Sequence, residues 1–293
     1  MKADASVGCV IINWNGWRDT VECLDALRST EYSRVIVVVV DNGSTDDSVL
    51  QIQAAHPDVR LVQTNKNLGF SGGNNAGIRE LLRLGVEYVW LLNNDTQPRP
   101  EALRELVGMA DANFRLGAIG SVLRYTSDPA RIQAWGGGWI NLWTGYNSHA
   151  VARPKAGRRL HFLTAASMLL RTKALQDIGL MDDRYFLYWE DADLCFRLRQ
   201  NGWGLGVAEK SIVLHSVNAT SCKSTASADR HYTYSAVRFL GQYAPIPLLA
   251  SSLFLSRRLL HRALLGQIEA IRNVWMGVMD YRNRDRWAAL PQP

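Results

Sequence analysis

The first hundred residues repeat one unit, in which a short run of apolar, β-branched residues is followed by polar residues and then by a stretch with helical spacing. The apolar runs span residues 7–13, 35–41, 59–64 and 88–93. Each run is short and bounded by turn-forming residues, so we predict that each is a β-strand. Strands that alternate with helices are joined by crossover connections, which build a mostly parallel sheet with helices on both faces. This pattern predicts an α/β fold.

Three helices are expected between these strands. Val21, Leu24 and Leu27 recur at three-residue spacing, which predicts the first helix. Residues 44–47 are typical of the N-terminal cap of a second helix. An amphipathic stretch over residues 75–84 predicts the third.

Composition limits the class of protein further. The chain has 293 residues, of which 47% are hydrophobic and 20% charged, so it can bury a large core and is too apolar to be disordered. Its four cysteines contain no CxxC pair, which excludes a zinc ribbon and a thioredoxin motif and favours a reducing, cytosolic compartment. Charged residues close to the start leave no room for the apolar region of a signal peptide.

The positive charge is concentrated at one end of the chain. The net charge is +6, and residues 231–293 hold eight arginines against three acidic residues. Residues 1–230 are therefore close to neutral. This distribution favours a small-molecule site over a nucleic-acid surface.

Polar residues follow the predicted strands at residues 13–16, 41–44, 65–67 and 93–96. A single cluster of this kind is an ordinary turn, because Asn, Asp and Gly form turns for local reasons. In a parallel sheet, however, the four clusters share the carboxyl edge, where such sheets bind ligands. Four clusters, two of them with carboxylates, favour a ligand site there.

Two common nucleotide sites are absent from this edge. The first strand is followed by Asn-Trp-Asn-Gly-Trp instead of a GxGxxG loop, and no GxxxxGK[ST] sequence occurs. A bound diphosphate would therefore need a metal ion to meet its charge.

Two further segments carry aromatic and acidic residues. Residues 123–160 are rich in Gly and Trp, including Trp135, and aromatic rings suit either a sugar surface or simple packing. Glu190, Asp191 and Asp193 follow an aromatic run and precede a helix-like segment, in which Asp193 can pair with Arg197. Glu190 and Asp191 suit either the N-terminus of that helix or a general base with a raised pKa.

Five motifs follow one another along the chain, at residues 10–15 (VIINWN), 41–46 (DNGSTD), 67–77 (NLGFSGGNNAG), 91–96 (LLNNDT) and 189–197 (WEDADLCFR). In this order they resemble family 2 glycosyltransferases with the GT-A fold, and within that family the bacterial rhamnosyltransferases that build cell-surface polysaccharides. The resemblance covers roughly residues 6–221. It implies a Rossmann-like, mostly parallel sheet flanked by helices, with a C-terminal helical extension.

The resemblance implies a role for the polar residues at the sheet edge. In the family, the corresponding positions hold the base and the ribose of a nucleotide-sugar. The residues matched to this role are Asn13, Asn15, Asp41, Asn67, Asn75 and Asn94.

The same resemblance implies a divalent metal, Mg²⁺ or Mn²⁺. The Asp-x-Asp motif of the family reads Asn93-Asn94-Asp95 here, so only Asp95 keeps its carboxylate. On the residues alone, a lone histidine is more often structural than a ligand. The resemblance nevertheless assigns a metal-binding role to His215, although the residues after it depart from the family pattern.

The resemblance identifies Asp191 as the catalytic base of an inverting transfer, with Glu190, Trp189 and Trp135 toward the acceptor. The expected reaction moves L-rhamnose from dTDP-rhamnose to a hydroxyl of a glycan or lipid-linked acceptor. A UDP-sugar is the alternative donor. Two other functions are more remote. A sugar nucleotidyltransferase normally has a triphosphate-binding loop near its N-terminus, and this sequence has none. A non-catalytic binder of glycan or membrane would not need both Asp95 and Asp191.

We divide the chain into a glycosyltransferase domain over residues 1–228 and a basic, amphipathic helical tail over residues 229–293. The domain has a nucleotide-binding half, residues 1–97, and an acceptor half, residues 98–228. Prolines interrupt the apolar part of the tail, so it is a poor membrane span. Apolar residues at helical spacing beside arginines, within residues 239–286, suit either a membrane surface or packing on the domain or a second subunit. We expect a cytoplasmic protein, peripheral on the inner face of the membrane if the tail binds lipid, and leave a homodimer open.

Overall fold

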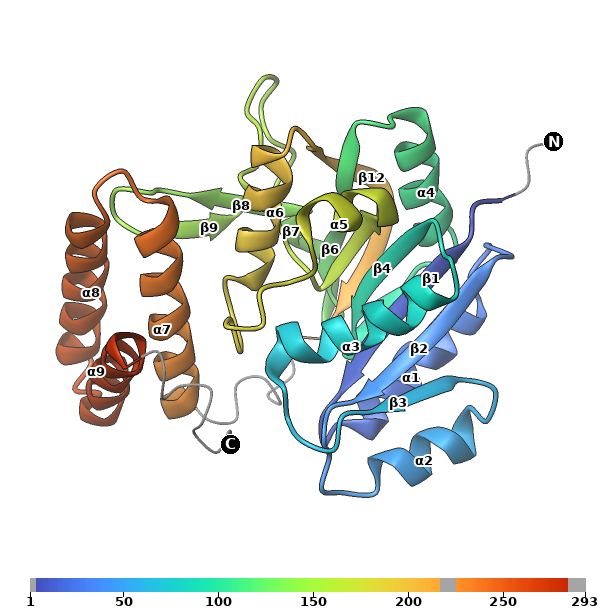
Figure 1. The fold of residues 1–293 in the computed structure, drawn as a ribbon, viewed down its shortest axis with the longest axis horizontal. Helices are drawn as coiled ribbons and strands as arrows, with labels where there is room; N and C mark the ends of the chain where they lie inside the picture. The colour runs from blue at the N-terminus through green and yellow to red at the C-terminus, as the bar shows by residue number, and fades with distance from the viewer. Residues whose placement is uncertain (1–3, 217–224, 284–293) are drawn as a thin grey trace.

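The computed structural model describes residues 4–216 and 225–283 (Figure 1). Residues 284–293 of the predicted tail lie outside the described residues. The strands are β1 (Val7–Asn13), β2 (Val35–Asp41), β3 (Arg60–Gln63), β4 (Tyr88–Asn93), β5 (Thr96–Pro98), β6 (Leu116–Tyr125), β7 (Asp128–Trp135), β8 (Gly137–Ile140), β9 (Asn147–His149), β10 (Phe162–Leu163), β11 (Ser167–Arg171) and β12 (Gly204–His215). The helices are α1 (Trp17–Arg28), α2 (Ser48–Ala55), α3 (Gly69–Arg83), α4 (Ala102–Ala112), α5 (Thr172–Ile178), α6 (Glu190–Gln200), α7 (Thr225–Tyr243), α8 (Pro247–Leu264) and α9 (Ile268–Arg282).

The central sheet confirms the predicted α/β architecture. Its strand order is β3-β2-β1-β4-β11-β6-β12-β5, and β7 extends it from β6. β1 pairs in parallel with both β2 and β4, and β2 with β3, as the alternation of strands and helices predicts. β11 runs antiparallel between β4 and β6, and β8, β9 and β10 form a separate small sheet.

Helices cover both faces of the sheet because the strand side chains alternate. On β1, Cys9 and Ile11 face the layer that contains α1 and α4, whereas Val10 faces the layer that contains α3, α5 and α6. α3 lies very close to the sheet at Gly77, where a Cβ would come within 2.6 Å of Val10 Cγ1. The glycine in this motif thus allows the close packing of helix on strand.

One expected element boundary needs correction. α3 begins at Gly69, six residues before the start of the predicted amphipathic stretch, because its first two turns are polar and glycine-rich yet buried at the sheet edge. α2 begins directly after Asp47, as predicted, and Asp46 Oδ1 accepts a hydrogen bond from the Ser48 N–H at 3.1 Å. α7 begins at Thr225, so the predicted domain boundary after residue 228 falls within this helix and stays a prediction.

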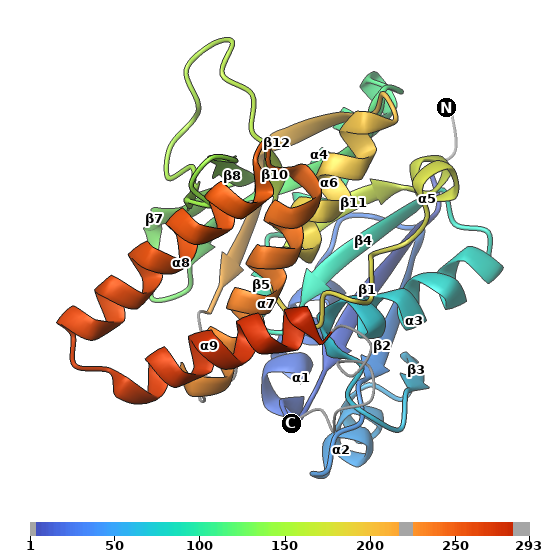
Figure 2. The ribbon, with the colours of Figure 1, turned by 60° about the vertical axis from the view of Figure 1, so that its left-hand side comes forward.

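The apolar repeat in the tail forms two helices instead of one. α8 ends at Leu264 and α9 begins at Ile268, with Gly266 at φ +67° in the turn between them. The two helices meet in a V (Figure 2). α9 packs along α7, and Arg230 on α7 forms an ion pair with Asp280 on α9. Part of the predicted apolar stripe thus packs within the protein.

Candidate active site at the carboxyl edge of the sheet

The ends of β1 and β2 bring two of the predicted nucleotide-binding residues together. Asn13 and Asp41 are paired in register, and Asn13 Nδ2 donates a hydrogen bond to Asp41 Oδ1 at 3.0 Å. Asn13 also donates to Ser44 Oγ at 3.1 Å, and Asp41 Oδ2 accepts from the Ser44 N–H at 3.1 Å. Both side chains are nearly inaccessible. Their hydrogen bonds hold the turn after β2 in a fixed conformation at the edge of the site.

Asn15 connects the loop after β1 with the loop after β2. Its backbone adopts the left-handed conformation, φ 52°, which asparagine tolerates better than most residues. In that conformation its Oδ1 accepts hydrogen bonds from the backbone N–H groups of Thr45 and Asp46, at 2.8 and 3.3 Å. The two loops are therefore held at a defined separation on the edge of the sheet.

The two asparagines of the glycine-rich segment have different surroundings. Asn67 Oδ1 accepts hydrogen bonds from Asn42 Nδ2 at 3.1 Å and from the Gly69 N–H at 2.9 Å, next to the start of α3. Asn75 lies deeper in α3, where its amide makes a two-way hydrogen bond with the backbone of Met181, at 2.8 and 3.1 Å. Asn75 therefore links α3 to the segment before α6, and its predicted role at the nucleotide stays a prediction.

Thr20 is a member of this edge that the sequence analysis missed. Its Oγ1 donates a hydrogen bond to Asn13 Oδ1 at 2.8 Å and accepts one from Asn94 Nδ2 at 3.1 Å. Thr20 thus joins the loop after β4 to the loop after β1. Thr20 could have been recognised in the sequence, because it carries the one hydroxyl in the first turn of the helix that follows Asn-Trp-Asn.

Asp95 and His215, far apart in the sequence, meet at the same edge. Asp95 Oδ1 lies 3.1 Å from His215 Nε2, and the side chains are 10% and 15% exposed. The two approach because β5 pairs antiparallel with β12, with Thr96 opposite His215. The structure therefore brings together the two residues to which the resemblance assigns a metal.

Gln133 on β7 determines which nitrogen of His215 faces Asp95. Gln133 Oε1 lies 2.7 Å from His215 Nδ1, and an amide oxygen accepts hydrogen bonds, so Nδ1 is the donor of this pair. Nε2 is then the nitrogen that faces Asp95. An imidazole nitrogen and a carboxylate oxygen are both groups that bind divalent metals. The donor set therefore fits a divalent metal ion.

The metal site would be incomplete with protein ligands alone. Among the described residues, no group of three or more His, Cys, Asp or Glu side chains could hold a metal. A carboxylate and an imidazole would leave the other positions to diphosphate oxygens and water. This is the arrangement of a metal that binds together with a substrate.

Glu190 and Asp191 occupy the first turn of α6. A helix N-terminus favours ionised carboxylates, and the backbone N–H of Ala192 donates to Asp191 Oδ1 at 2.7 Å. Burial outweighs these effects and raises the pKa of Asp191 to about 6. Burial, followed by the charge of Asp191, raises the pKa of Glu190 well above its ordinary value. A carboxylate that titrates close to neutral pH suits a general base.

The chain is strained immediately before these carboxylates. Tyr188 and Trp189 both have positive φ angles, 70° and 68°, which bulky residues rarely adopt. The Trp189 ring is held in place by Phe239 and Tyr232 of α7, at centroid distances of 5.0 and 5.9 Å. Strain of this kind persists only where packing over-determines it, and it concentrates at functional sites. Packing of the tail thus fixes the entry to α6.

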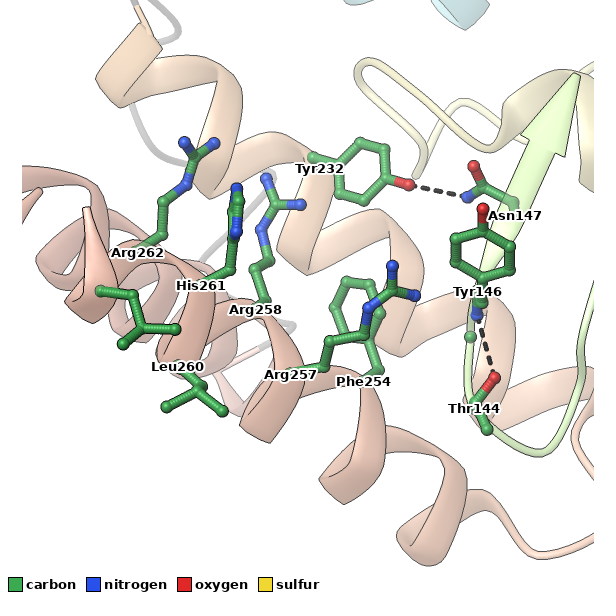
Figure 3. A pocket seen from close by; sticks show the side chains of 12 residues that line it. Thr144, Tyr146, Asn147, Tyr232, Phe254, Arg257, Arg258, Leu260, His261 and Arg262 are labelled. Atoms are coloured by element: carbon green, nitrogen blue, oxygen red, sulfur yellow. Dashed lines mark hydrogen bonds between the residues drawn. The ribbon is translucent and has the colours of Figure 1, made fainter.

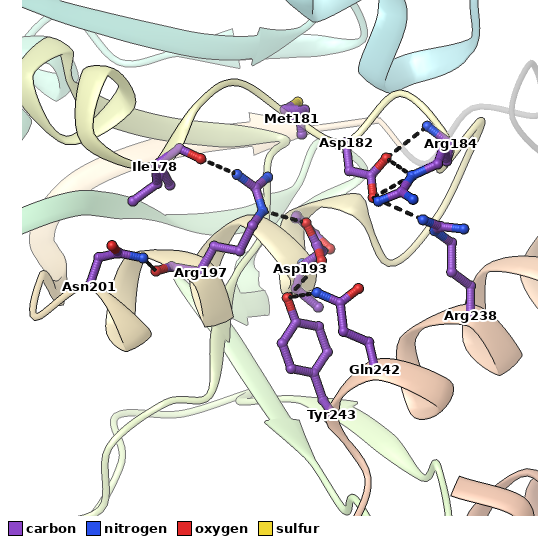
Figure 4. A network of polar contacts seen from close by, with 12 residues as sticks. Ile178, Met181, Asp182, Arg184, Asp193, Arg197, Asn201, Arg238, Gln242 and Tyr243 are labelled. Atoms are coloured by element: carbon purple, nitrogen blue, oxygen red, sulfur yellow. Dashed lines mark hydrogen bonds and ion pairs between the residues drawn. The ribbon is translucent and has the colours of Figure 1, made fainter.

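Asp193 connects α6 to its neighbours (Figure 4). Arg197 Nε donates to Asp193 Oδ2 at 2.7 Å, which confirms the predicted pair at four-residue spacing. Tyr243 at the end of α7 donates to Asp193 Oδ1 at 2.8 Å. Asp193 is 1% exposed and acts as a structural anchor for the tail.

The predicted acceptor residues have different surroundings. Trp189 is 5% exposed, and its ring packs on α7. Trp135, at the end of β7, lines a cavity of about 1220 Å³ together with Arg199 and Trp203. Their roles at the acceptor remain predictions.

Comparison with known proteins decides the family. The sequence model described as Glycosyl transferase family 2 matches residues 9–179, which is more than half of the chain. The chain belongs to glycosyltransferase family 2. The matched region contains the predicted nucleotide-binding residues and Asp95, and ends before Glu190, Asp191 and His215.

Two relatives and one solved structure are similar to this glycosyltransferase. N-acetylglucosaminyl-diphospho-decaprenol L-rhamnosyltransferase of Mycobacterium tuberculosis is 29% identical over 222 residues, 68% of this chain and 72% of the relative. Low-salt glycan biosynthesis hexosyltransferase Agl10 of Haloferax volcanii is 23% identical over 266 residues, 83% of this chain and 86% of the relative. Mannosyltransferase PcManGT of Pyrobaculum calidifontis, in complex with GDP-Man and Mn²⁺, aligns with a TM-score of 0.61 at 16% identity, covering all of this chain and 78% of that one.

The structural similarity confirms the GT-A fold that the sequence motifs predict. Within residues 4–216 and 225–283, none of the helices combines the length and the apolar character needed to cross a membrane.

Proposed function

We propose that this glycosyltransferase moves L-rhamnose from dTDP-rhamnose to a hydroxyl of a saccharide carried on a lipid diphosphate, with inversion at the anomeric carbon. The observation that carries the reaction type is the partly buried Asp191, with its pKa raised to about 6, in the first turn of α6. The substrates are inferred from the mycobacterial relative, which is described as a rhamnosyltransferase acting on N-acetylglucosaminyl-diphospho-decaprenol.

The proposed step is a single displacement. The carboxylate of Asp191 accepts the proton of the acceptor hydroxyl while that oxygen forms a bond to the anomeric carbon. The bond from the anomeric carbon to the diphosphate oxygen breaks, and the nucleoside diphosphate leaves with the electron pair. A positioned general base contributes about 10²–10⁴ to such a rate.

Asp95 and His215 would hold the divalent metal, with Gln133 orienting the imidazole. When bound, the metal would stabilise the charge that develops on the diphosphate. Mg²⁺ prefers oxygen ligands throughout, whereas imidazole suits transition metals. The His215 nitrogen therefore favours Mn²⁺ over Mg²⁺ at this site.

Calorimetric titration with dTDP, UDP and GDP, each with and without Mn²⁺ or Mg²⁺, tests the donor. We expect the tightest binding for dTDP with Mn²⁺, and transfer of rhamnose from dTDP-rhamnose to a lipid-diphosphate saccharide. Asp95→Ala should abolish the effect of the metal. The proposal would be contradicted if GDP bound tightly and dTDP did not. It would also be contradicted if the metal changed nucleotide binding as much in Asp95→Ala as in the parent.

A second candidate donor is a UDP-sugar, for transfer of another hexose. It is favoured by the similarity to the archaeal hexosyltransferase, which extends over a larger share of this chain than the rhamnosyltransferase. Preferential binding of UDP in the same titration would select it.

A further inference from the structure

A pocket of about 450 Å³ lies between the turn after β8 and the helices α7 and α8 (Figure 3). This volume falls within the usual range of ligand sites, about 300–1000 Å³. The turn contributes Tyr146 and Asn147, and α7 contributes Tyr232. The face of α8 contributes Phe254, Arg257, Arg258, Leu260, His261, Arg262 and Leu264.

Positive charge dominates this pocket. Arg258 and Arg262 share one carboxylate, that of Asp229, which is 2% exposed. Arg257 lies over the ring of Tyr146, 4.4 Å from its centroid, and makes no ion pair with any residue that the structure describes. Three guanidinium groups against a single carboxylate leave an excess of positive charge.

Two groups in the pocket retain hydrogen-bonding capacity. Arg258 Nε is buried and has no hydrogen-bond partner within residues 4–216 and 225–283. The Tyr232 hydroxyl oxygen accepts a hydrogen bond from Asn147 Nδ2 at 2.7 Å, which leaves its proton for another acceptor. An arginine fork together with a hydroxyl donor is the chemistry that recognises phosphate oxygens.

The pocket is adjacent to the candidate active site. Tyr232, which forms one wall, contacts the rings of Tyr188 and Trp189, at centroid distances of 5.5 and 5.9 Å. These two residues immediately precede Glu190 and Asp191. A ligand in the pocket would therefore lie one side chain away from the segment that leads into the proposed base.

Apolar side chains lie beside the charged ones. Leu260 and Leu264 line the pocket and are 62% and 77% exposed, although both are aliphatic. An exposed apolar surface next to an anion site matches a ligand with a phosphate head and a hydrocarbon chain.

We propose that this pocket binds the diphosphate of a polyprenyl-diphosphate-linked acceptor, with Arg257, Arg258 and Arg262 on the phosphate oxygens and the first isoprene units along Leu260 and Leu264. The inference rests on the proposed function, because it assigns a site to the acceptor of that reaction. The saccharide at the other end of the diphosphate then extends past Tyr232 toward Asp191.

The test is calorimetric binding of farnesyl diphosphate to the full chain, compared with Arg257→Gln. Arg257 is the most suitable residue to substitute because it makes no ion pair with Asp229. Its loss therefore leaves no buried charge unpaired. A hydrogen bond to a charged group contributes about 1.5–3 kcal/mol, so we expect binding about ten-fold weaker or worse in the variant. Arg272→Gln on α9, which does not line the pocket, is the matched control and should bind as the parent does.

Three probes separate the sources of the phosphate. Farnesyl diphosphate should bind more tightly than inorganic pyrophosphate, because only the former has a chain for Leu260 and Leu264. Equal affinities would overturn the proposal in favour of a free diphosphate. A different result with lipid vesicles would also overturn the proposal. This would be the case if Arg257→Gln weakened binding to phosphatidylglycerol vesicles but did not change the binding of farnesyl diphosphate.

The proposed function and this inference can fail separately. Farnesyl diphosphate binding requires no nucleotide-sugar, so it would persist in Arg272→Gln and in the parent even if no donor were turned over. Conversely, dTDP binding should be the same in Arg257→Gln as in the parent. If Arg257→Gln lost both dTDP binding and farnesyl diphosphate binding, the substitution would disturb the fold. Arg257→Lys, which keeps the charge, is then the deciding variant. The proposal stands only if this variant restores dTDP binding and part of the farnesyl diphosphate binding.

Discussion

At the residue scale, the candidate site depends on pairs of side chains that modify each other. Asp191 lies beside the buried Glu190, and Asp95 lies against His215, whose ring is oriented by Gln133. In each pair one group forms part of the surroundings of the other. These pairs give predictions that can be measured on single substitutions.

Asp191→Asn should lower the rate of sugar transfer by about 10²–10⁴, because the amide cannot accept the acceptor proton. Binding of the nucleotide, measured by calorimetry, should be unchanged. Asp183→Asn is the matched control, since Asp183 is exposed and lies outside α6. Near-normal transfer by Asp191→Asn would disprove the role of Asp191 as the base.

The pH dependence of transfer should show the raised pKa of Asp191. Below pH 6 the carboxyl is protonated and cannot accept a proton, whereas above pH 6 it is ionised and active. We therefore expect kcat/KM to rise with pH through about 6 and then to level off. An acidic limb near pH 4, the range of an ordinary aspartate, would show that burial does not affect the base.

Gln133→Ala should weaken the activation by Mn²⁺. Residues that orient a metal-binding histidine typically contribute about 10–100-fold to metal affinity. We expect the Mn²⁺ concentration for half-maximal activity to rise by that factor, with activity recovered at high Mn²⁺. Gln53→Ala, on the exposed side of α2, is the control and should leave the Mn²⁺ concentration for half-maximal activity unchanged. An equal response in both variants would contradict the proposed orientation of His215.

At the element scale, α3 and α6 are positioned by contacts that the sequence pattern does not reveal. α3 begins two turns earlier than its hydrophobic spacing predicts, because Asn74 and Asn75 in its first half are buried polar residues. Asn75 joins α3 to the Met181 backbone, close to the segment that leads into α6. This amide is thus one of the links between α3 and the segment before α6.

Asn75→Ala should destabilise the fold, because the N–H and C=O of Met181 would lose their buried partners. Each unsatisfied buried group costs about 1–3 kcal/mol. Because two groups lose their partners, we expect the free energy of unfolding in urea to fall by about 2–6 kcal/mol, with nucleotide affinity retained per folded molecule. Asn273→Ala on α9, where the amide bonds only within its own helix, is the control. Lost nucleotide affinity at unchanged stability would instead support the role implied by the family resemblance.

At the scale of the whole molecule, the helical tail is part of the site. α7 supports Trp189 before the proposed base, and Tyr243 holds Asp193 in α6. α8 forms the wall of the basic pocket. The tail packs closely enough that a Cβ at Gly277 on α9 would lie 2.5 Å from the Arg230 carbonyl oxygen.

Gly277→Ala should therefore loosen the tail. Overpacking of a tight contact costs about 1–3 kcal/mol, and we expect a loss of this size in thermal or urea unfolding. Farnesyl diphosphate binding should weaken in parallel, because α8 and α9 pack together. Gly108→Ala on α4 is the control, since no atom lies within 4 Å of a Cβ there. Unchanged stability of Gly277→Ala would show that α9 does not pack on α7.

The sequence by itself determined the α/β class, the parallel strands at residues 7–13, 35–41 and 88–93, and the edge on which Asn13 and Asp41 lie. These follow from local patterns, because side-chain alternation and turn chemistry act between neighbouring residues. The family and its GT-A fold followed from ordered motifs, which comparison confirmed.

Only the tertiary structure decided the contacts between distant segments. It paired Asp95 with His215 and placed Gln133 behind the ring, and it brought Tyr232 against Trp189. It also placed Trp135 in the lining of a cavity and divided the tail at Gly266. These outcomes depend on strand pairing and helix packing between residues far apart in the chain, and no local pattern records which distant surfaces will be buried together.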